Sequence, residues 1–234
     1  MHSLDTVPAI VSLAFLATTL LTIWLFFRAV NHSRPTLTIL ISWAILQSII
    51  ALNGLYLDTS AVPPRILLSL LPVFIFIGIL FNSLKGKAFI DGLSLEKLTL
   101  LHIVRVPIEI VLYWLFLYKA IPQLMTFEGR NFDILAGITA PIIYYFVFVK
   151  KTLSHKILLG WNIVCLLLLI NIVVNAILAS PVPFQQFAFE QPNIAIIYFP
   201  YNLLPSVVVP LVLFSHLVTI RRLLKSRVDN VIIN

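Results

Sequence analysis

Seven long stretches of almost uninterrupted apolar residues constrain this chain more than any other feature. A helix needs roughly 20 such residues to cross a hydrocarbon core about 30 Å thick. The stretches run without alternation and most are about twice as long as a tilted transmembrane strand requires. They lie at approximately 8–27, 36–57, 65–84, 98–118, 134–149, 157–179 and 195–220, of which the fifth is short and the seventh carries three prolines. The sequence therefore predicts an all-α polytopic membrane protein built as a bundle of seven transmembrane helices.

The composition excludes the soluble alternatives. Hydrophobic residues make up 60% of the 234 positions and charged residues 11%, whereas soluble domains average about 45–50% and 25%. A single cysteine excludes a disulfide framework. Because no long hydrophilic segment interrupts the apolar stretches, we expect one transmembrane domain over 1–234. Asp5, and the lack of Lys or Arg between Met1 and Val7, argue that the first stretch is a retained helix and not a signal peptide.

The basic residues are distributed very unevenly between the predicted connections. Loops with an excess of Lys and Arg stay on the cytoplasmic side of a membrane. Twelve basic residues fall on the side of the C-terminus and three on the other side, with Arg105 inside a span. The twelve are Arg28, Arg34, Lys85, Lys87, Lys97, Lys150, Lys151, Lys156, Arg221, Arg222, Lys225 and Arg227; the three are Arg65, Lys119 and Arg130. This bias predicts an external N-terminus and an internal C-terminus, and it accounts for the net charge of +7 without nucleic-acid binding.

Ionisable residues at membrane depth are costly and are functional candidates by default. The fourth stretch carries His102, Arg105 and Glu109, which fall within about 60° of one helix face at about 100° per residue. Pro107 leaves the carbonyl of Ile103 without its helical donor. Two interpretations stand: an ion pair between Arg105 and Glu109 within the helix, with His102 near the interface, or a polar cavity that opens to the cytoplasmic side.

The seventh stretch complements the fourth. Pro200, Pro205 and Pro210 argue against a continuous straight helix there, and broken helices are tolerated where they line protein or water-filled space. His216 lies five residues before Arg221, just as His102 lies five residues after Lys97, so we expect both histidines at a similar depth. Asn162 begins the sixth stretch at the same level, and Asn202 follows the first of the prolines. Most such amides join helices to one another.

These residues define the predicted site. It would be lined by His102, Arg105, Glu109 and His216, with Asn162 and Asn202 supporting them. Arg105 would hold an anionic group, and Glu109 would act as a proton acceptor or counter-ion. No catalytic residue can be assigned.

We expect no cofactor and no metal. HExxH spacing is absent, and His2, His32 and His155 lie in predicted loops or termini, so a third histidine ligand is lacking within the membrane. A haem b with His102 and His216 as axial ligands is the alternative. The seventh stretch has no lysine for a retinal Schiff base, and the seven glycines form no phosphate-binding loop.

An outer connection carries further charges. It reads Met125-Thr-Phe-Glu-Gly-Arg-Asn-Phe-Asp133. Asp133 or Asn131 is well placed to cap the helix that follows. Capping and a local ion pair would explain these residues without a function.

Three segments carry a resemblance. They are Leu101-His-Ile-Val-Arg-Val-Pro-Ile-Glu109, Phe127-Glu-Gly-Arg-Asn-Phe-Asp-Ile-Leu135 and Pro200-Tyr-Asn-Leu-Leu-Pro205. They resemble segments of small, uncharacterised seven-helix membrane proteins of bacteria. The resemblance implies the architecture and a multi-pass location in a bacterial inner membrane, and it implies no activity.

Three functions remain open on the sequence. The leading hypothesis is an intramembrane polar site that binds or transports a small molecule, an anion or a proton. The second is a membrane-embedded enzyme that acts on a lipid or isoprenoid with Glu109 or His102 as acid or base, and it predicts an apolar groove open to lipid beside those residues. The third is a structural subunit of a membrane complex. The expected partners are the bilayer and a small-molecule or lipid ligand; the oligomeric state stays open.

Overall fold

The chain is all-helical. The computed structural model describes residue 4 and residues 6–232, and within these no strand occurs. The α-helices are α1 (Ala9–Ala29), α2 (Arg34–Leu52), α3 (Leu67–Asn82), α4 (Leu84–Asp91), α5 (Leu95–Leu101), α6 (Arg105–Leu117), α7 (Ile134–Tyr144), α8 (His155–Leu178) and α9 (Val209–Ile232). Short 3₁₀ turns lie at Leu55–Leu57, His102–Val104, Gln123–Met125 and Ala195–Ile197, and π-helical turns at Tyr145–Val149 and Leu204–Val208. The prediction of an all-α fold is confirmed.

Within the described residues, five helical segments are long and apolar enough to cross a membrane. They are Ala9–Ala29, Arg34–Leu52, Leu95–Leu117, His155–Leu178 and Leu204–Lys225. The pair α3 and α4 adds a sixth if the two are taken as one bent span, and Ile134–Val149 is a shorter apolar helix. The number of spans and their orientation stay predictions.

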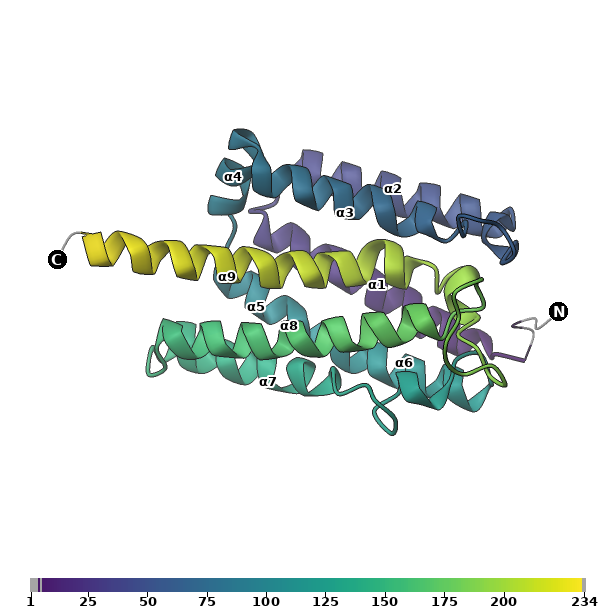
Figure 1. Ribbon diagram of the computed structural model, residues 1–234. Helices are drawn as coiled ribbons and strands as arrows, with labels where there is room; N and C mark the ends of the chain where they lie inside the picture. The colour runs from purple at the N-terminus through teal and green to yellow at the C-terminus, as the bar shows by residue number, and fades with distance from the viewer. Residues whose placement is uncertain (1–3, 5, 233–234) are drawn as a thin grey trace.

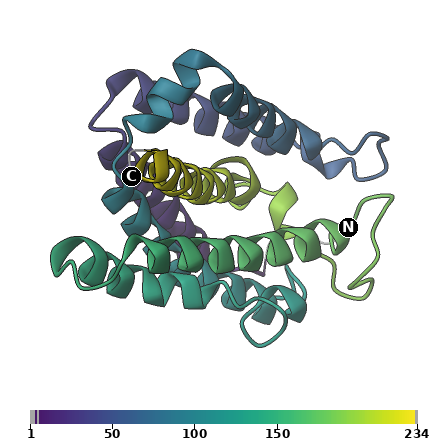
Figure 2. The ribbon, with the colours of Figure 1, turned by 60° about the vertical axis from the view of Figure 1, so that its left-hand side comes forward.

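Helix α9 is central and α2 is peripheral. The buried share of the apolar window is 61% in Leu204–Lys225 but 11% in Arg34–Leu52. In Figure 1 the helices α2 and α3 run together along one side of α9, while α7 and α8 lie on its other side. The rotated view in Figure 2 keeps α9 between these two groups. Helix α1 packs against α5 and α6 and completes the core around α9.

The third predicted span ends in a sharp corner. Helices α3 and α4 meet at 88°. Ser83 stops α3 and caps α4, because its hydroxyl accepts from the backbone N–H of Gly86 at 3.1 Å. A Cβ on Gly86 would lie 2.3 Å from the carbonyl oxygen of Leu80, so the corner requires glycine. Helix α4 therefore turns away from the axis of α3.

The fourth and seventh predicted spans are interrupted in different ways. The fourth begins at Leu95, where Ser94 caps α5, and passes through the 3₁₀ turn His102–Val104 before α6. Pro107 cannot donate to Ile103, and the tighter turn lies at that position. The seventh begins later than its apolar composition predicts: a 3₁₀ turn and irregular backbone occupy 195–203, and regular α-helix starts only at Val209.

Candidate functional site

Arg105 is the centre of a buried polar cluster. It is the first residue of α6, and its side chain is 4% exposed. Its Nη1 donates to Oδ1 of Asp133 at 3.2 Å and to the backbone carbonyl of Cys165 at 3.3 Å. Its Nη2 lies 2.9 Å from Nε2 of His216. One guanidinium thus joins α6 to α8, α9 and the segment that precedes α7.

The partners of His216 define its tautomer. Because a guanidinium can only donate, Nε2 of His216 accepts from Arg105 and carries no proton. The other ring nitrogen, Nδ1, lies 2.9 Å from Oδ1 of Asn162 and donates to it. Asn162 is held in turn by a bond from its Nδ2 to the carbonyl of Leu158 at 2.9 Å. His216 is therefore a neutral ring fixed between Arg105 and Asn162.

His102 lies against His216 without a polar partner of its own. The two imidazole rings stack with centroids 3.9 Å apart and planes inclined by 18°. The Trp161 ring meets His102 edge-on at 5.5 Å. His102 is completely buried, and neither of its ring nitrogens has a hydrogen-bond partner in the described part of the chain. Such a side chain is unusual, because buried polar groups are nearly always paired.

Glu109 is held by one oxygen only. Its Oε1 accepts from Nδ2 of Asn131 at 2.6 Å, and its Oε2 is buried without a partner among the described residues. Nδ2 of Asn131 also donates to the carbonyl of Met125, and its Oδ1 accepts from the backbone N–H of Asp133. Arg105 forms its ion pair with Asp133 and not with Glu109. The expected ion pair between Arg105 and Glu109 within one helix is therefore not formed.

A small cavity adjoins these charges. Its volume is about 30 Å³, and Arg105, Glu109 and Asp133 form its polar wall. Its apolar wall consists of Val104, Ile108, Leu169, Leu204, Val208, Val209 and Val212. A space of at least 10–15 Å³ by this measure is enough for one water molecule. The cavity therefore accommodates water or a small ion and no organic molecule of ordinary size.

Gly137 allows α7 to lie close to the cluster. A Cβ on this residue would come within 2.8 Å of Cγ2 of Val106 and 3.2 Å of Cβ of Arg105. The close contact brings the start of α7, and with it Asp133, against the first turn of α6. The ion pair between Arg105 and Asp133 depends on this approach.

The structure brings together five of the six predicted site residues. His102, Arg105, Glu109, His216 and Asn162 belong to one cluster, as described above. Asn202 lies elsewhere: it is buried, and its Nδ2 donates to the backbone carbonyl of Gln47 in α2 at 3.0 Å. It joins α2 to the irregular segment before α9 and does not support the cluster.

Sequence reasoning missed the roles of Asp133 and Asn131. One or the other was expected to cap α7, next to a local ion pair. Asp133 does occupy the N-cap position of α7, but its side chain makes no capping hydrogen bond and pairs with Arg105. The sequence did contain a signal for this pair. Arg105 lies in the fourth span, and the next connection carries two acidic residues that could pair with it, Glu128 and Asp133.

The histidine geometry does not favour an axial haem pair. Axial imidazoles stand on opposite faces of a porphyrin, each with one nitrogen on the iron. Both nitrogens of His216 are engaged by Arg105 and Asn162, and its ring lies flat on that of His102. In this arrangement a porphyrin does not fit between the two rings.

A family model matches most of the chain. It is described as a domain of unknown function (DUF8737), and it covers residues 62–224, which is more than half of the sequence. The chain belongs to this family. No curated protein and no solved structure matches it. The DUF8737 region includes every member of the polar cluster, from His102 to His216, whereas α1 and α2 precede it.

Proposed function

We propose that the protein is an integral membrane protein of seven spans, with its N-terminus outside and its C-terminus inside, and that its buried polar cluster binds and transfers a proton. The observation that carries the second part is that Glu109 lines a cavity of about 30 Å³ and has one carboxylate oxygen without a partner among the described residues, beside an Arg105 already paired with Asp133. The family description names no activity, so the function rests on this geometry.

Several structural features support the membrane location. Large apolar side chains are exposed along the outside of the bundle, among them Leu20, Ile39 and Ile75. Lipid would cover such a surface, whereas water would leave it as a large exposed patch. The predicted internal connections also meet at one end, because Asn31 donates to the carbonyl of Gly92 at 3.1 Å and Arg221 pairs with Asp91.

The charge of the cluster favours a proton over an anion. With its carboxyl groups ionised it holds one cation, Arg105, against two anions, Asp133 and Glu109. An anionic ligand would add to this excess, and both Nη groups of Arg105 are already engaged by protein, which leaves only Nε without a partner among the described residues. A buried net charge is costly, and one proton on Glu109 removes it. The cavity is large enough for water that would carry that proton.

Proton transfer in liposomes tests this proposal. Purified protein would be reconstituted with a pH-sensitive dye inside the vesicles, and a potassium diffusion potential would drive proton entry. We expect wild-type protein to acidify the lumen. Glu109→Gln keeps the size and the bond from Asn131 but cannot lose or gain this proton, so we expect acidification to fall to the rate of empty liposomes.

Glu128→Gln is the matched control. It makes the same change at an exposed loop position, and we expect wild-type rates from it. Equal acidification by wild type and Glu109→Gln, with both variants folded by size-exclusion chromatography, would refute the proton site.

Thiol labelling tests the orientation. Cys165 is buried and gives a low background. Ser60→Cys and Thr152→Cys each place an exposed thiol in a connection, on opposite predicted sides. In intact cells an impermeant maleimide should label Ser60→Cys and spare Thr152→Cys, which reacts only after the membrane is opened. The reverse pattern would overturn the orientation, and labelling of both would overturn the membrane location.

A membrane-embedded enzyme that acts on a lipid is the second candidate function, and one structural observation supports it. An apolar groove of about 120 Å³ lies between α3, α8 and the start of α9, and it shares Leu204 and Val209 with the polar cavity. A lipid chain in that groove would lie one residue layer from Glu109. This hypothesis predicts that a total lipid extract incubated with wild-type protein, but not with Glu109→Gln, shows a change in its mass spectrum.

A further inference from the structure

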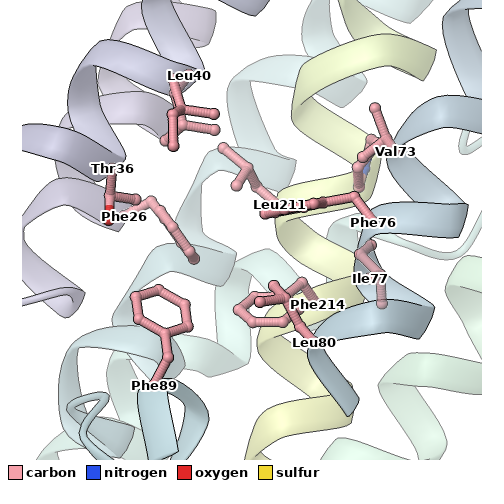
Figure 3. Close-up of a pocket in the computed structure, with 12 residues that line it drawn as sticks. Phe26, Thr36, Leu40, Val73, Phe76, Ile77, Leu80, Phe89, Leu211 and Phe214 are labelled. Carbon is pink, nitrogen blue, oxygen red and sulfur yellow. The ribbon is translucent and has the colours of Figure 1, made fainter. Parts of the chain in front are cut away.

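A second, larger apolar groove lies on the other side of α9 from the polar cluster. Its volume is about 250 Å³, and Figure 3 shows side chains from α1, α2, α3, α4 and α9 converging on it. Phe26, Leu40, Phe76, Phe89 and Phe214 are among its walls. The groove offers almost no polar surface to an occupant, because its one hydroxyl, on Thr36, is bonded to Ser33 at 3.0 Å.

The inner end of this groove is basic. Helix α4 closes that end with Phe89, and Lys85 lies on the same face of α4, four residues earlier. Arg34 begins α2 at the same end of the groove, but it lies on the face of the helix opposite Thr36, which lines the groove two residues later. Both basic side chains are exposed.

No carboxylate among the described residues neutralises this end. Lys85, Lys87 and Arg34 form no salt bridge there. Asp91, the acidic residue of α4, is already paired with Arg221 and Lys225. An apolar slot that ends in uncompensated cations matches a molecule with a hydrocarbon chain and an anionic head.

We propose that this groove is a binding site for an anionic phospholipid of the inner leaflet. One acyl chain lies between α2, α3 and α9, and the phosphate lies at Lys85. The proposal uses the membrane location proposed above but not the proton site, since none of its residues belongs to the polar cluster. A failure of one therefore leaves the other standing.

Native mass spectrometry of the detergent-purified protein tests it. The probes are phosphatidylglycerol and phosphatidylcholine with identical acyl chains. We expect wild-type monomer to retain phosphatidylglycerol in preference. One basic residue near a headgroup contributes enough for roughly a fivefold change in affinity, so Lys85→Gln should lower phosphatidylglycerol binding about fivefold and leave phosphatidylcholine binding unchanged. Leu40→Trp, which fills the groove, should reduce the binding of both lipids.

Two control variants match these changes. Lys156→Gln removes an exposed internal lysine at the start of α8, and Ile45→Trp enlarges an exposed apolar residue of α2 outside the groove. Both should bind lipid as the wild type does. The proposal is overturned if the wild type does not distinguish the two lipids, or if Lys85→Gln binds them as Lys156→Gln does. It is also overturned if the protein is a dimer that binds no lipid and only the dissociated monomer binds it, because a second copy would then cover the groove.

Discussion

At the scale of single residues, the polar cluster depends on groups that have no substitute nearby. Arg105 uses Nη1 and Nη2 for three bonds, and Asn131 orients both carboxylates, one through its side-chain amide and one through the backbone of Asp133. In a buried network of this kind the loss of one member leaves the others unpaired. The largest energetic effects in the chain should therefore come from conservative changes at these few positions.

Asp133→Asn tests the ion pair with Arg105. The substitution keeps the volume but leaves the guanidinium buried without a counter-charge at Asp133, since both side chains are less than one-tenth exposed. Removal of one partner from a buried pair costs about 3–5 kcal/mol. We expect a fall in Tm of roughly 6–20 °C in a detergent thermal melt.

Asp58→Asn is the control for that change. Asp58 pairs with Arg65 at 2.7 Å, but both side chains are more than one-third exposed. An exposed pair contributes about 0–1 kcal/mol, so its Tm should stay close to that of the wild type. A similar loss for both variants would show that the Arg105 pair has no special importance.

The residues of the site were predictable to the extent that they lie on helices. Periodicity placed His102, Arg105 and Glu109 on one face, and matched distances from flanking basic residues paired His102 with His216. The contacts of Asp133 and Asn131 were not predicted, because these residues lie in a connection that folds back into the bundle. Sequence spacing does not indicate when a connection folds in this way. Asn202, which bonds to Gln47 and to no member of the cluster among the described residues, lies in an irregular segment where helical spacing gives no position.

At the scale of elements, apolar length predicted the straight helices and failed at the bends. The predicted stretches 8–27 and 157–179 lie close to α1 and α8. The stretch 65–84 hides the corner at Ser83, and the stretch 195–220 includes residues before Val209 that are apolar but not regularly helical. Hydropathy reports whether a segment prefers lipid to water, whereas capping serines, prolines and glycines decide where its helix ends.

Gly137→Ala tests the contact between α6 and α7. The added methyl group would meet the side chain and backbone of Val106 at less than 3.0 Å, so the two helices must separate. We expect a loss of about 1–3 kcal/mol from overpacking, together with a proton-transfer defect if the separation moves Asp133 from Arg105. Both are measurable on one preparation, by thermal melt and by the liposome assay.

Gly160→Ala provides the comparison. Beyond its chain neighbours and the adjacent backbone of α8, no atom of the described residues lies within 4 Å of a Cβ at this position. Alanine is favoured over glycine in helices by about 1 kcal/mol, so this variant should be as stable as the wild type or more so. If Gly137→Ala were equally harmless, the close approach of α7 would not be needed.

At the scale of the whole molecule, a charged contact joins α4 to α9 at the end of the bundle that is predicted to be internal. Arg221 of α9 pairs with Asp91 of α4, and Lys225 lies 3.2 Å from the same carboxylate. The hydrogen bond from Arg221 holds the pKa of Asp91 below its usual value of 3.8. The contact links the corner after α3 to the central helix.

This contact should make the thermal stability of the protein depend on pH in the acidic range. A carboxyl group with a lowered folded-state pKa contributes its full stabilisation above its unfolded pKa and loses it as the pH falls through the lowered value. We expect the Tm of the wild type to exceed that of Asp91→Asn at pH 7 and the difference to disappear as the pH falls through the lowered folded-state pKa of Asp91. A difference that stays constant with pH would mean that Asp91 acts through packing and not through its charge.

The central position of α9 has a consequence for how freely the sequence can vary. Leu211 and Phe214 line the larger apolar groove, while Val212 lines the polar cavity and His216 bonds to Arg105. Neighbouring positions of α9 are thus constrained by two different sites, and few of them can be substituted freely. In a saturation-mutagenesis screen α9 should be the least permissive segment, and α2, which is mostly exposed, should accept nearly any apolar replacement.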